Sequence, residues 1–144
     1  MLQHKLVIIE GLPGTGKTTT ATLLKQYLED RNIKTACYLE GNFDHPVDYE
    51  GVAYFSTQAY ETFVKNHQLY GQLGDYLIED GPGYLIYYLK YHEELKEIMS
   101  DDTFQKISQQ DIYALDLEKH VELMLNRWET FAEKVKNGER TYIF

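Results

Sequence analysis

The first 40 residues alternate between apolar runs and polar breaks in a strand–helix–strand order. Residues 6–9 form an unbroken apolar run between polar neighbours, which is typical of a strand buried on both faces. Ala21, Leu24 and Leu28 then recur at helical spacing, and a second strand-like run follows over residues 34–39. This order predicts a βαβ unit with two parallel strands and a right-handed crossover.

The middle of the chain loses this pattern. Residues 54–73 are predicted to be helical, with Phe63 and Tyr70 on the inner face, and residues 103–110 are predicted to form a short helix. From Asp48 to about residue 140, no further strand of the parallel sheet is predicted.

A hairpin is predicted within this middle region. Residues 76–78 and 84–89 are rich in tyrosine, leucine and isoleucine, and they flank Gly81-Pro82-Gly83. Such runs on either side of a glycine–proline turn are typical of two antiparallel strands. A broken pair of helices is the alternative interpretation.

The strongest helical pattern lies near the end of the sequence. Apolar residues recur there at alternating steps of four and three, which predicts an amphipathic helix. They are Leu117, Val121, Met124, Trp128, Phe131 and Val135. Asp116 is the expected N-cap and Gly138 the expected stop. Residues 141–144 resemble a buried strand, so the chain is expected to continue beyond Phe144.

A phosphate-binding loop is predicted between the first strand and the first helix. Residues 11–18 satisfy the pattern GxxxxGK followed by Ser or Thr. Its glycines let backbone N–H groups point into one cavity, to which the helix adds its positive end. The expected binding residues are Gly11, Leu12, Pro13, Gly14, Thr15, Gly16, Lys17, Thr18 and Thr19.

Two side chains of this loop carry specific roles in the prediction. Lys17 is expected to reach the β and γ phosphates, and the Thr18 hydroxyl to coordinate Mg²⁺. The predicted cofactors are therefore ATP and Mg²⁺. A glycine turn that merely joins a strand to a helix is the alternative interpretation.

Composition narrows the classes of partner. The chain has 14 Lys and Arg against 23 Asp and Glu, a net charge of −9, which disfavours binding to nucleic-acid phosphates. No apolar stretch is long enough to span a membrane, and the N-terminus lacks the pattern of a signal peptide. The single cysteine, Cys37, fits a reducing compartment. Cytoplasmic location is predicted, and the oligomeric state is left open.

The loop and its flanks resemble a known group of enzymes. Ile9-Glu10-Gly11, followed by residues 14–19, resembles the opening of P-loop small-molecule kinases, and thymidylate and deoxynucleoside kinases share that glutamate. Residues 38–42 resemble the end of the second strand in adenylylsulfate kinases, where an acidic-glycine stretch faces the acceptor. The resemblance covers about the first third of the chain, and implies ATP-dependent phosphoryl transfer to a small hydroxyl or phosphate acceptor.

The same resemblance implies a carboxylate that orients or deprotonates the acceptor. Glu40 and Asp44 match that position, after the second strand, and ligands of open parallel sheets collect at the carboxyl ends of strands. Lys17, Glu40 and Asp44 are therefore the predicted catalytic residues, and His45 is a further candidate. Solvated loop carboxylates are the alternative. The acidic-arginine pair and arginine-bearing lid of those kinases would lie beyond Phe144.

Further residues are candidates for the remaining parts of such a site. Asp80 is either a magnesium-binding carboxylate or a hairpin-turn residue, and Arg127 is a candidate to reach the phosphates. Nine of the thirteen tyrosines fall within residues 49–91, where they either stack on a base or cover the hairpin. Asp48–Gly51 matches the DxxG motif of Ras-like GTPases. The sequence contains no NKxD motif, which reads the guanine base in those proteins, so a Ras-like GTPase is disfavoured. His92-Glu93 lacks the second histidine of a zinc site.

The sequence as a whole predicts an α/β fold of the P-loop type. Residues 6–9, 34–39 and 141–144 form its parallel sheet within a single domain over residues 1–144, and a helical and hairpin insertion over 49–115 covers the acceptor. The predicted function is a kinase that acts on a small-molecule acceptor. The alternative is a nucleotide-binding or ATP-hydrolysing regulatory module, whose conformational change is read by a partner.

Overall fold

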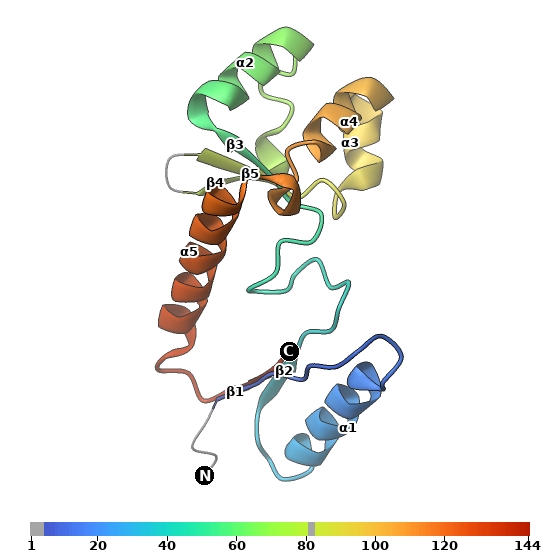
Figure 1. Ribbon diagram of the computed structural model, residues 1–144, viewed down its shortest axis with the longest axis vertical. Coiled ribbons are helices and arrows are strands. Elements are labelled where there is room, and N and C mark those ends of the chain that lie inside the picture. Colours follow the sequence, from blue (N-terminus) through green and yellow to red (C-terminus); the bar gives the residue numbers. More distant parts are fainter. Residues whose placement is uncertain (1–4, 81–82) are drawn as a thin grey trace. The chain divides into compact units, whose positions relative to one another are not determined.

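The computed structural model describes residues 5–80 and 83–144 and has an α/β fold (Figure 1). Its chain divides into two compact units, Met1–Val47 with Arg127–Phe144 and Asp48–Asn126. The helices are α1 (Lys17–Glu29), α2 (Thr57–His67), α3 (His92–Ile98), α4 (Asp101–Ser108) and α5 (Leu117–Val135). The strands are β1 (Leu6–Val7), β2 (Thr35–Cys37), β3 (Ala53–Ser56), β4 (Leu77–Asp80), β5 (Gly83–Ile86) and β6 (Thr141–Ile143).

The first unit contains the parallel sheet, in the order β1-β6-β2. Leu6 pairs with Tyr142, and Cys37 pairs with Ile143. The three predicted strands are confirmed, although each is shorter than expected. The prediction that the first run is buried on both faces is wrong, because Ile8 is 53% exposed. Its strand lies at an edge of the described sheet, where one side of the chain has no neighbour to cover it.

Helix α1 covers one face of this sheet, as its apolar spacing predicts. Ala21 and Leu28 are buried and cluster with Ile143 of the central strand β6. The βαβ unit predicted from the first 40 residues is therefore present, with β6 inserted between its two strands. The carboxyl ends of β1, β6 and β2 share one edge of the sheet, because all three strands run in parallel.

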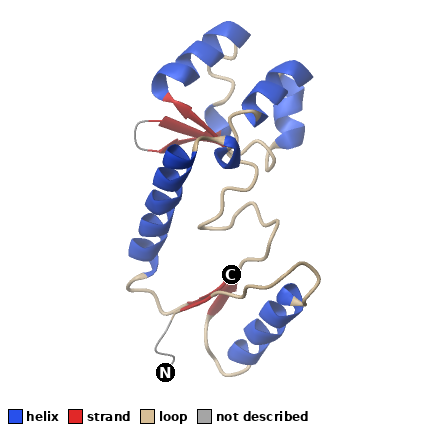
Figure 2. Ribbon diagram, viewed as in Figure 1, coloured by secondary structure: helices blue, strands red, loops and turns tan. Residues whose placement is uncertain are grey.

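The second unit contains an antiparallel sheet in the order β3-β5-β4 (Figure 2). Strands β4 and β5 pair from Leu77 with Ile86 to Asp80 with Gly83. This pairing confirms the predicted hairpin and excludes the broken pair of helices. Gly81 and Pro82, which the prediction placed in the turn, lie outside the described residues.

Residues 54–73 differ from the long helix that was predicted. Ala53–Ser56 is strand β3, and α2 begins only after Ser56, whose hydroxyl accepts a hydrogen bond from the Ala59 N–H at 3.2 Å. The helix ends at His67. Phe63 is buried as predicted, whereas Tyr70 is 66% exposed and lies beyond the helix. Helical spacing of aromatic residues concealed the strand, because a four-residue run is too short to show alternation.

The core of the second unit is built mainly from residues of its strands and helices. Helix α4 confirms the short helix predicted over 103–110. Its N-cap is Ser100, whose hydroxyl accepts a hydrogen bond from the Thr103 N–H. Single 3₁₀ turns occur at Gly74–Tyr76 and Ile112–Ala114. Fully buried apolar residues include Leu73, Ile86, Leu95, Ile107 and Ile112.

Helix α5 confirms the strongest helical prediction, including its cap. The Asp116 carboxylate accepts a hydrogen bond from the Lys119 N–H at 3.0 Å. The buried face is only partly as predicted, because Leu117 is 77% exposed while Leu123, outside the predicted stripe, is 3% exposed. Apolar spacing defines a stripe, but the neighbouring elements decide which part of it is covered.

Candidate nucleotide-phosphate site

The glycine-rich loop leaves the end of β1 and enters α1. The Ile9 N–H donates to the Phe144 carbonyl at 2.7 Å, which fixes the backbone just before the loop. Gly14 and Gly16 have φ values of 78° and 91°, in the left-handed region that favours glycine. Gly16 directly precedes α1, so its conformation sets the direction in which the helix begins.

The side chains of the loop hold it in a curled conformation. The Lys17 ammonium donates to the carbonyl oxygens of Gly11 at 2.9 Å and Leu12 at 3.3 Å. The Thr15 hydroxyl and N–H both donate to the Leu12 carbonyl, at 2.7 Å and 3.2 Å. The ammonium of Lys17 therefore lies over the loop that precedes it, where a bound phosphate would compete for the same donor.

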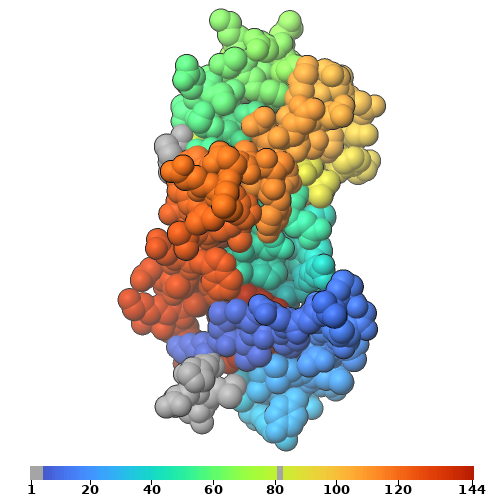
Figure 3. All heavy atoms as spheres, viewed as in Figure 1, coloured from blue at the N-terminus to red at the C-terminus, as the bar shows by residue number. Residues whose placement is uncertain are grey.

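The start of α1 suits an anion. Its first turn contains no acidic residue, and Gly16 offers no side chain to cap it. The first N–H groups of a helix lack partners within the helix and carry its positive end. Thr18 and Thr19 are exposed in this turn, and the N-terminal segment that carries the loop forms part of the surface in Figure 3.

The two predicted acceptor carboxylates lie in the loop that follows β2. Glu40 and Asp44 are both exposed. Gly41 has a φ of 83°, and the Asn42 side chain accepts a hydrogen bond from the Asp44 N–H at 2.9 Å. Because β1 and β2 run in parallel, this loop and the glycine-rich loop leave the same edge of the sheet. The structure thus places the predicted residues at one edge, and their catalytic roles stay a prediction.

His45 is engaged in packing in this structure. Its ring lies 4.6 Å from the Phe144 ring and 5.7 Å from the Tyr38 ring, measured between centroids. Its Nδ1 accepts a hydrogen bond from the Val47 N–H at 3.3 Å. These contacts fix the position of the loop after β2. They give His45 a structural role that requires no part in catalysis.

Arg127 of α5 contacts the same loop. Its Nη2 donates to the His45 carbonyl at 2.7 Å, and its Nε donates to the Pro46 carbonyl at 3.0 Å. The sequence suggested that Arg127 could reach phosphates, but these two donors point to backbone oxygens. No sequence pattern indicates such a contact, because main-chain carbonyls are present at every residue.

The other candidates of the middle region have structural roles. Asp80 ends β4 in the antiparallel sheet, so it does not follow a strand of the parallel sheet, and the hairpin interpretation holds. The tyrosines largely cover the second unit's core: the Tyr60 and Tyr84 rings are 4.5 Å apart. Tyr88 is buried and donates to Asp111 at 2.7 Å, and burial and this hydrogen bond raise its pKa.

Two general findings concern ligands and membranes. Among the described residues, no three or more histidine, cysteine, aspartate or glutamate side chains are grouped closely enough to hold a metal ion. No helix of the described chain combines the length and apolar character that a membrane span requires.

Comparison with known proteins adds one match. The family model described as "Chromatin associated protein KTI12" matches residues 5–70, which span β1 to α2 and make up less than half of the chain. Neither the curated proteins nor the solved structures contain a match. The family match agrees with the P-loop character of the 11–18 segment, and it does not support the resemblance to small-molecule kinases.

Proposed function

We propose that this chain is a nucleotide-binding P-loop protein with a regulatory output, in which bound ATP changes a conformation that a protein partner reads. One observation carries the proposal. The loop between β1 and α1 contains two glycines in the left-handed conformation, Gly14 and Gly16, and no side chain caps the start of α1. The Lys17 ammonium lies over this loop. The partial KTI12 match supports nucleotide binding of this kind more than it supports a kinase.

The residues present fit a magnesium–triphosphate complex. The Lys17 ammonium would exchange its contacts with the Gly11 and Leu12 carbonyls for oxygens of the β and γ phosphates. The loop N–H groups and the start of α1 would neutralise the remaining charge. The exposed Thr18 hydroxyl would hold Mg²⁺ together with phosphate oxygens and water. Net charge of −9 favours a free nucleotide over a nucleic acid as the phosphate ligand.

Thermal unfolding with nucleotide tests the binding step. Mg-ATP at 100 times its dissociation constant should stabilise the folded chain by about 2.7 kcal/mol. Lys17→Ala should remove most of this stabilisation. Lys25→Ala is the matched control, because Lys25 lies further along the same helix and pairs with Glu29 at 3.0 Å. Equal stabilisation of the Lys17→Ala variant and the wild type would refute the site, and parallel runs with Mg-GTP identify the preferred base.

A kinase that acts on a small acceptor is the second candidate. It is favoured by the position of Glu40 and Asp44 at the sheet edge from which the glycine-rich loop also leaves. ATP labelled in its γ phosphate, incubated with a panel of nucleosides, nucleotides and small hydroxyl compounds, separates the two functions. Steady phosphate release without acceptor supports the regulatory module. Acceptor-dependent label transfer that is lost in Glu40→Gln or Asp44→Asn supports the kinase.

A further inference from the structure

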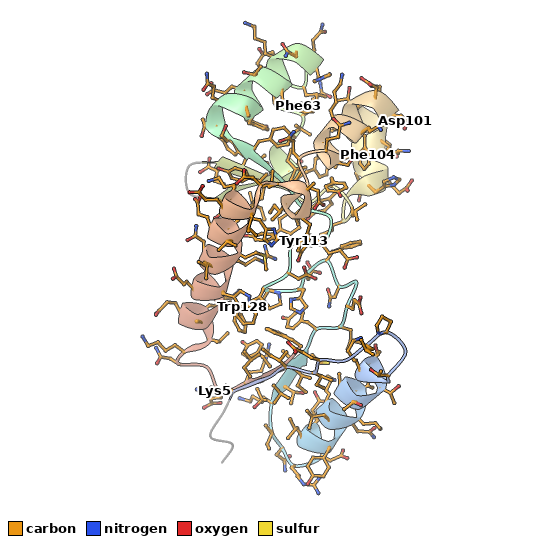
Figure 4. The ribbon with its side chains drawn as sticks, in the orientation of Figure 1. Lys5, Phe63, Asp101, Phe104, Tyr113 and Trp128 are labelled. Atoms are coloured by element: carbon orange, nitrogen blue, oxygen red, sulfur yellow. The ribbon has the colours of Figure 1, made fainter. Side chains whose placement is uncertain are left out.

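A groove in the second unit lies along α2. It has a volume of about 480 Å³. Its buried lining residues are Phe55 of β3 and Phe63 of α2, whose ring centroids lie 5.2 Å apart; Phe63 is labelled in Figure 4. The exposed lining residues are Ser56, Gln58, Ala59, Thr62, Asn66 and Gln110. An occupant of the groove would therefore rest on aromatic carbon, with small and polar side chains around it.

Two contacts hold the opposite ends of this groove. The Tyr54 N–H donates to the Gln110 carbonyl at 2.9 Å, which attaches the segment after α4 to β3, beside the start of α2. The His67 Nδ1 lies 3.3 Å from the Thr103 hydroxyl, which connects the last residue of α2 to the first turn of α4. The lining follows α2 from Gln58 to His67, a length of about 13 Å at the helical rise per residue.

Uncharged polar side chains of α2 form a row along the groove. Gln58, Thr62 and Asn66 recur at every fourth residue, so they share one face of the helix at intervals of about 6 Å. Within the part of the chain that the structure describes, the side-chain amides of Gln58, Asn66 and Gln110 make no hydrogen bond. Their donors and acceptors are available to an occupant of the groove.

The groove is also uncharged, although the chain is acidic. No Asp, Glu, Lys or Arg occurs among the described residues that line it. Glu61 and Lys65, the charged residues of α2, lie outside the lining and have opposite signs. Asp102, which interacts with His67, pairs with Lys106 at 2.7 Å. A charged occupant would lose hydration without gaining an ion pair, so the groove favours an uncharged one.

An extended peptide chain fits this row of side chains. One residue of such a chain presents its N–H and C=O to one edge, and the next residue presents them to the other edge. A side-chain amide can accept from the N–H and donate to the C=O at the same time. Gln58 and Asn66 lie about 12 Å apart along α2, which is close to the separation of about 13 Å between residues four apart in an extended chain. Two amides at this separation favour an extended chain over a nucleobase or a sugar ring.

We propose that this groove binds an extended, uncharged segment of a partner protein. The amides of Gln58 and Asn66 bond the main chain of the segment at one edge, and the Gln110 amide bonds it at the other. Alternate side chains of the segment rest on Phe55 and Phe63. This mode of recognition uses main-chain hydrogen bonds for affinity and the aromatic lining for specificity. The proposal does not depend on nucleotide binding, because the groove belongs entirely to the second unit.

The side-chain NH₂ groups of Gln58, Asn66 and Gln110 provide direct reporters in nuclear magnetic resonance spectra. The probe is a short synthetic peptide that is capped at both ends and in which valine alternates with serine. Binding should shift these three NH₂ signals in a saturable way. Absence of any saturable shift would refute the proposal. Adenosine that shifts the signals where the peptide does not would make the groove a small-molecule site and would also overturn the proposal.

Two ester analogues of the peptide test whether its main chain is bound in an extended conformation. One carries esters in place of the valine N–H groups and the other in place of the serine N–H groups, so each lacks the donors of one edge. The analogue that lacks the donors facing α2 should bind at least about tenfold more weakly, since several hydrogen bonds are lost. The other analogue should bind within about threefold of the parent peptide. Equal binding of the two analogues would contradict the proposal.

Gln58→Glu tests the contact from the protein side. The change replaces an amide donor by a second acceptor and adds a charge, so it should weaken peptide binding at least about fivefold. Helix α2 should tolerate the change, because an acidic side chain in the first turn interacts favourably with the helix dipole. Gln105→Glu is the matched control, because it adds the same charge at an exposed residue of α4 outside the lining. Equal peptide binding by the two variants would overturn the proposed contact.

Ala59→Leu tests the location by filling the groove. Ala59 is exposed, and leucine is a good helix former, so the variant should unfold at the same urea concentration as the wild type. Its binding of the peptide should be lost. Undiminished binding would show that the peptide lies elsewhere. NH₂ signals that shift with protein concentration alone, together with dimer formation in sedimentation, would make a second copy the occupant and would also overturn the proposal.

Discussion

Arg127 fixes the carbonyl oxygen of His45 by a 2.7 Å hydrogen bond from its Nη2 atom. A second bond, from Nε to the Pro46 carbonyl, is 3.0 Å long. The two bonds join α5 to the loop that follows β2. The predicted acceptor residue Asp44 directly precedes His45, so the position of this carboxylate depends on a residue of α5 that lies 82 positions after His45 in the sequence.

Arg127→Ala should destabilise the first unit. The substitution leaves two partly buried carbonyls without their donors, and such a loss costs about 1–3 kcal/mol. Urea unfolding monitored by Trp128 emission measures it, because Trp128 lies in the same unit. Arg140→Ala is the matched control, since Arg140 is exposed. Equal unfolding midpoints for the two variants would show that the contacts contribute nothing.

The sequence predicted the elements with regular spacing and missed those whose positions depend on distant contacts. Helices α1 and α5 and the β4–β5 hairpin follow from local periodicity. Strand β3 was missed because its residues also fit a helical pattern, and only pairing with β5 makes them a strand. The loop at 11–18 was predictable because its glycines and lysine have fixed spacing. The contacts of Arg127 were not predictable, because the acceptors are main-chain carbonyl oxygens of a loop.

Gly51→Ala should destabilise the second unit. Gly51 has a φ of 68°, and a Cβ atom there would overlap the side chain of Leu89. The left-handed conformation costs a residue with a side chain about 1–2 kcal/mol, and overpacking adds about 1–3 kcal/mol. The measurement is urea unfolding followed by circular dichroism.

Gly71→Ala separates these two costs. Gly71 has a nearly equal φ of 71°, but a Cβ atom there would meet nothing within 4 Å. Gly71→Ala should therefore show only the backbone cost, and Gly51→Ala should be the more destabilised variant. Similar unfolding midpoints for the two variants would contradict the proposed clash with Leu89.

Cys37 should be a slow nucleophile in the folded chain. Partial burial raises the pKa of its thiol, although the charge of Lys25 acts in the opposite direction. The rate of alkylation by iodoacetamide should therefore rise at higher pH in the folded protein than in the urea-unfolded chain. Lys25→Ala should move the folded profile to still higher pH. A folded profile that coincides with the unfolded one would contradict the effect of burial.

Tyr113 should make stability fall at alkaline pH. Partial burial and the hydrogen bond that it donates to the Asp48 carboxylate raise its pKa to about 12. Between about pH 10 and pH 12, the folded state keeps the Tyr113 proton that the unfolded chain has already lost. The contribution of Tyr113 to the stability of the folded state is therefore complete below about pH 10 and is lost as the pH rises towards 12. Urea midpoints measured across this interval should decline less in Tyr113→Phe than in the wild type. Asp48→Asn should lower the Tyr113 pKa in a difference titration of tyrosinate absorbance against Tyr113→Phe. An unchanged titration in Asp48→Asn would show that the carboxylate does not hold the proton on Tyr113.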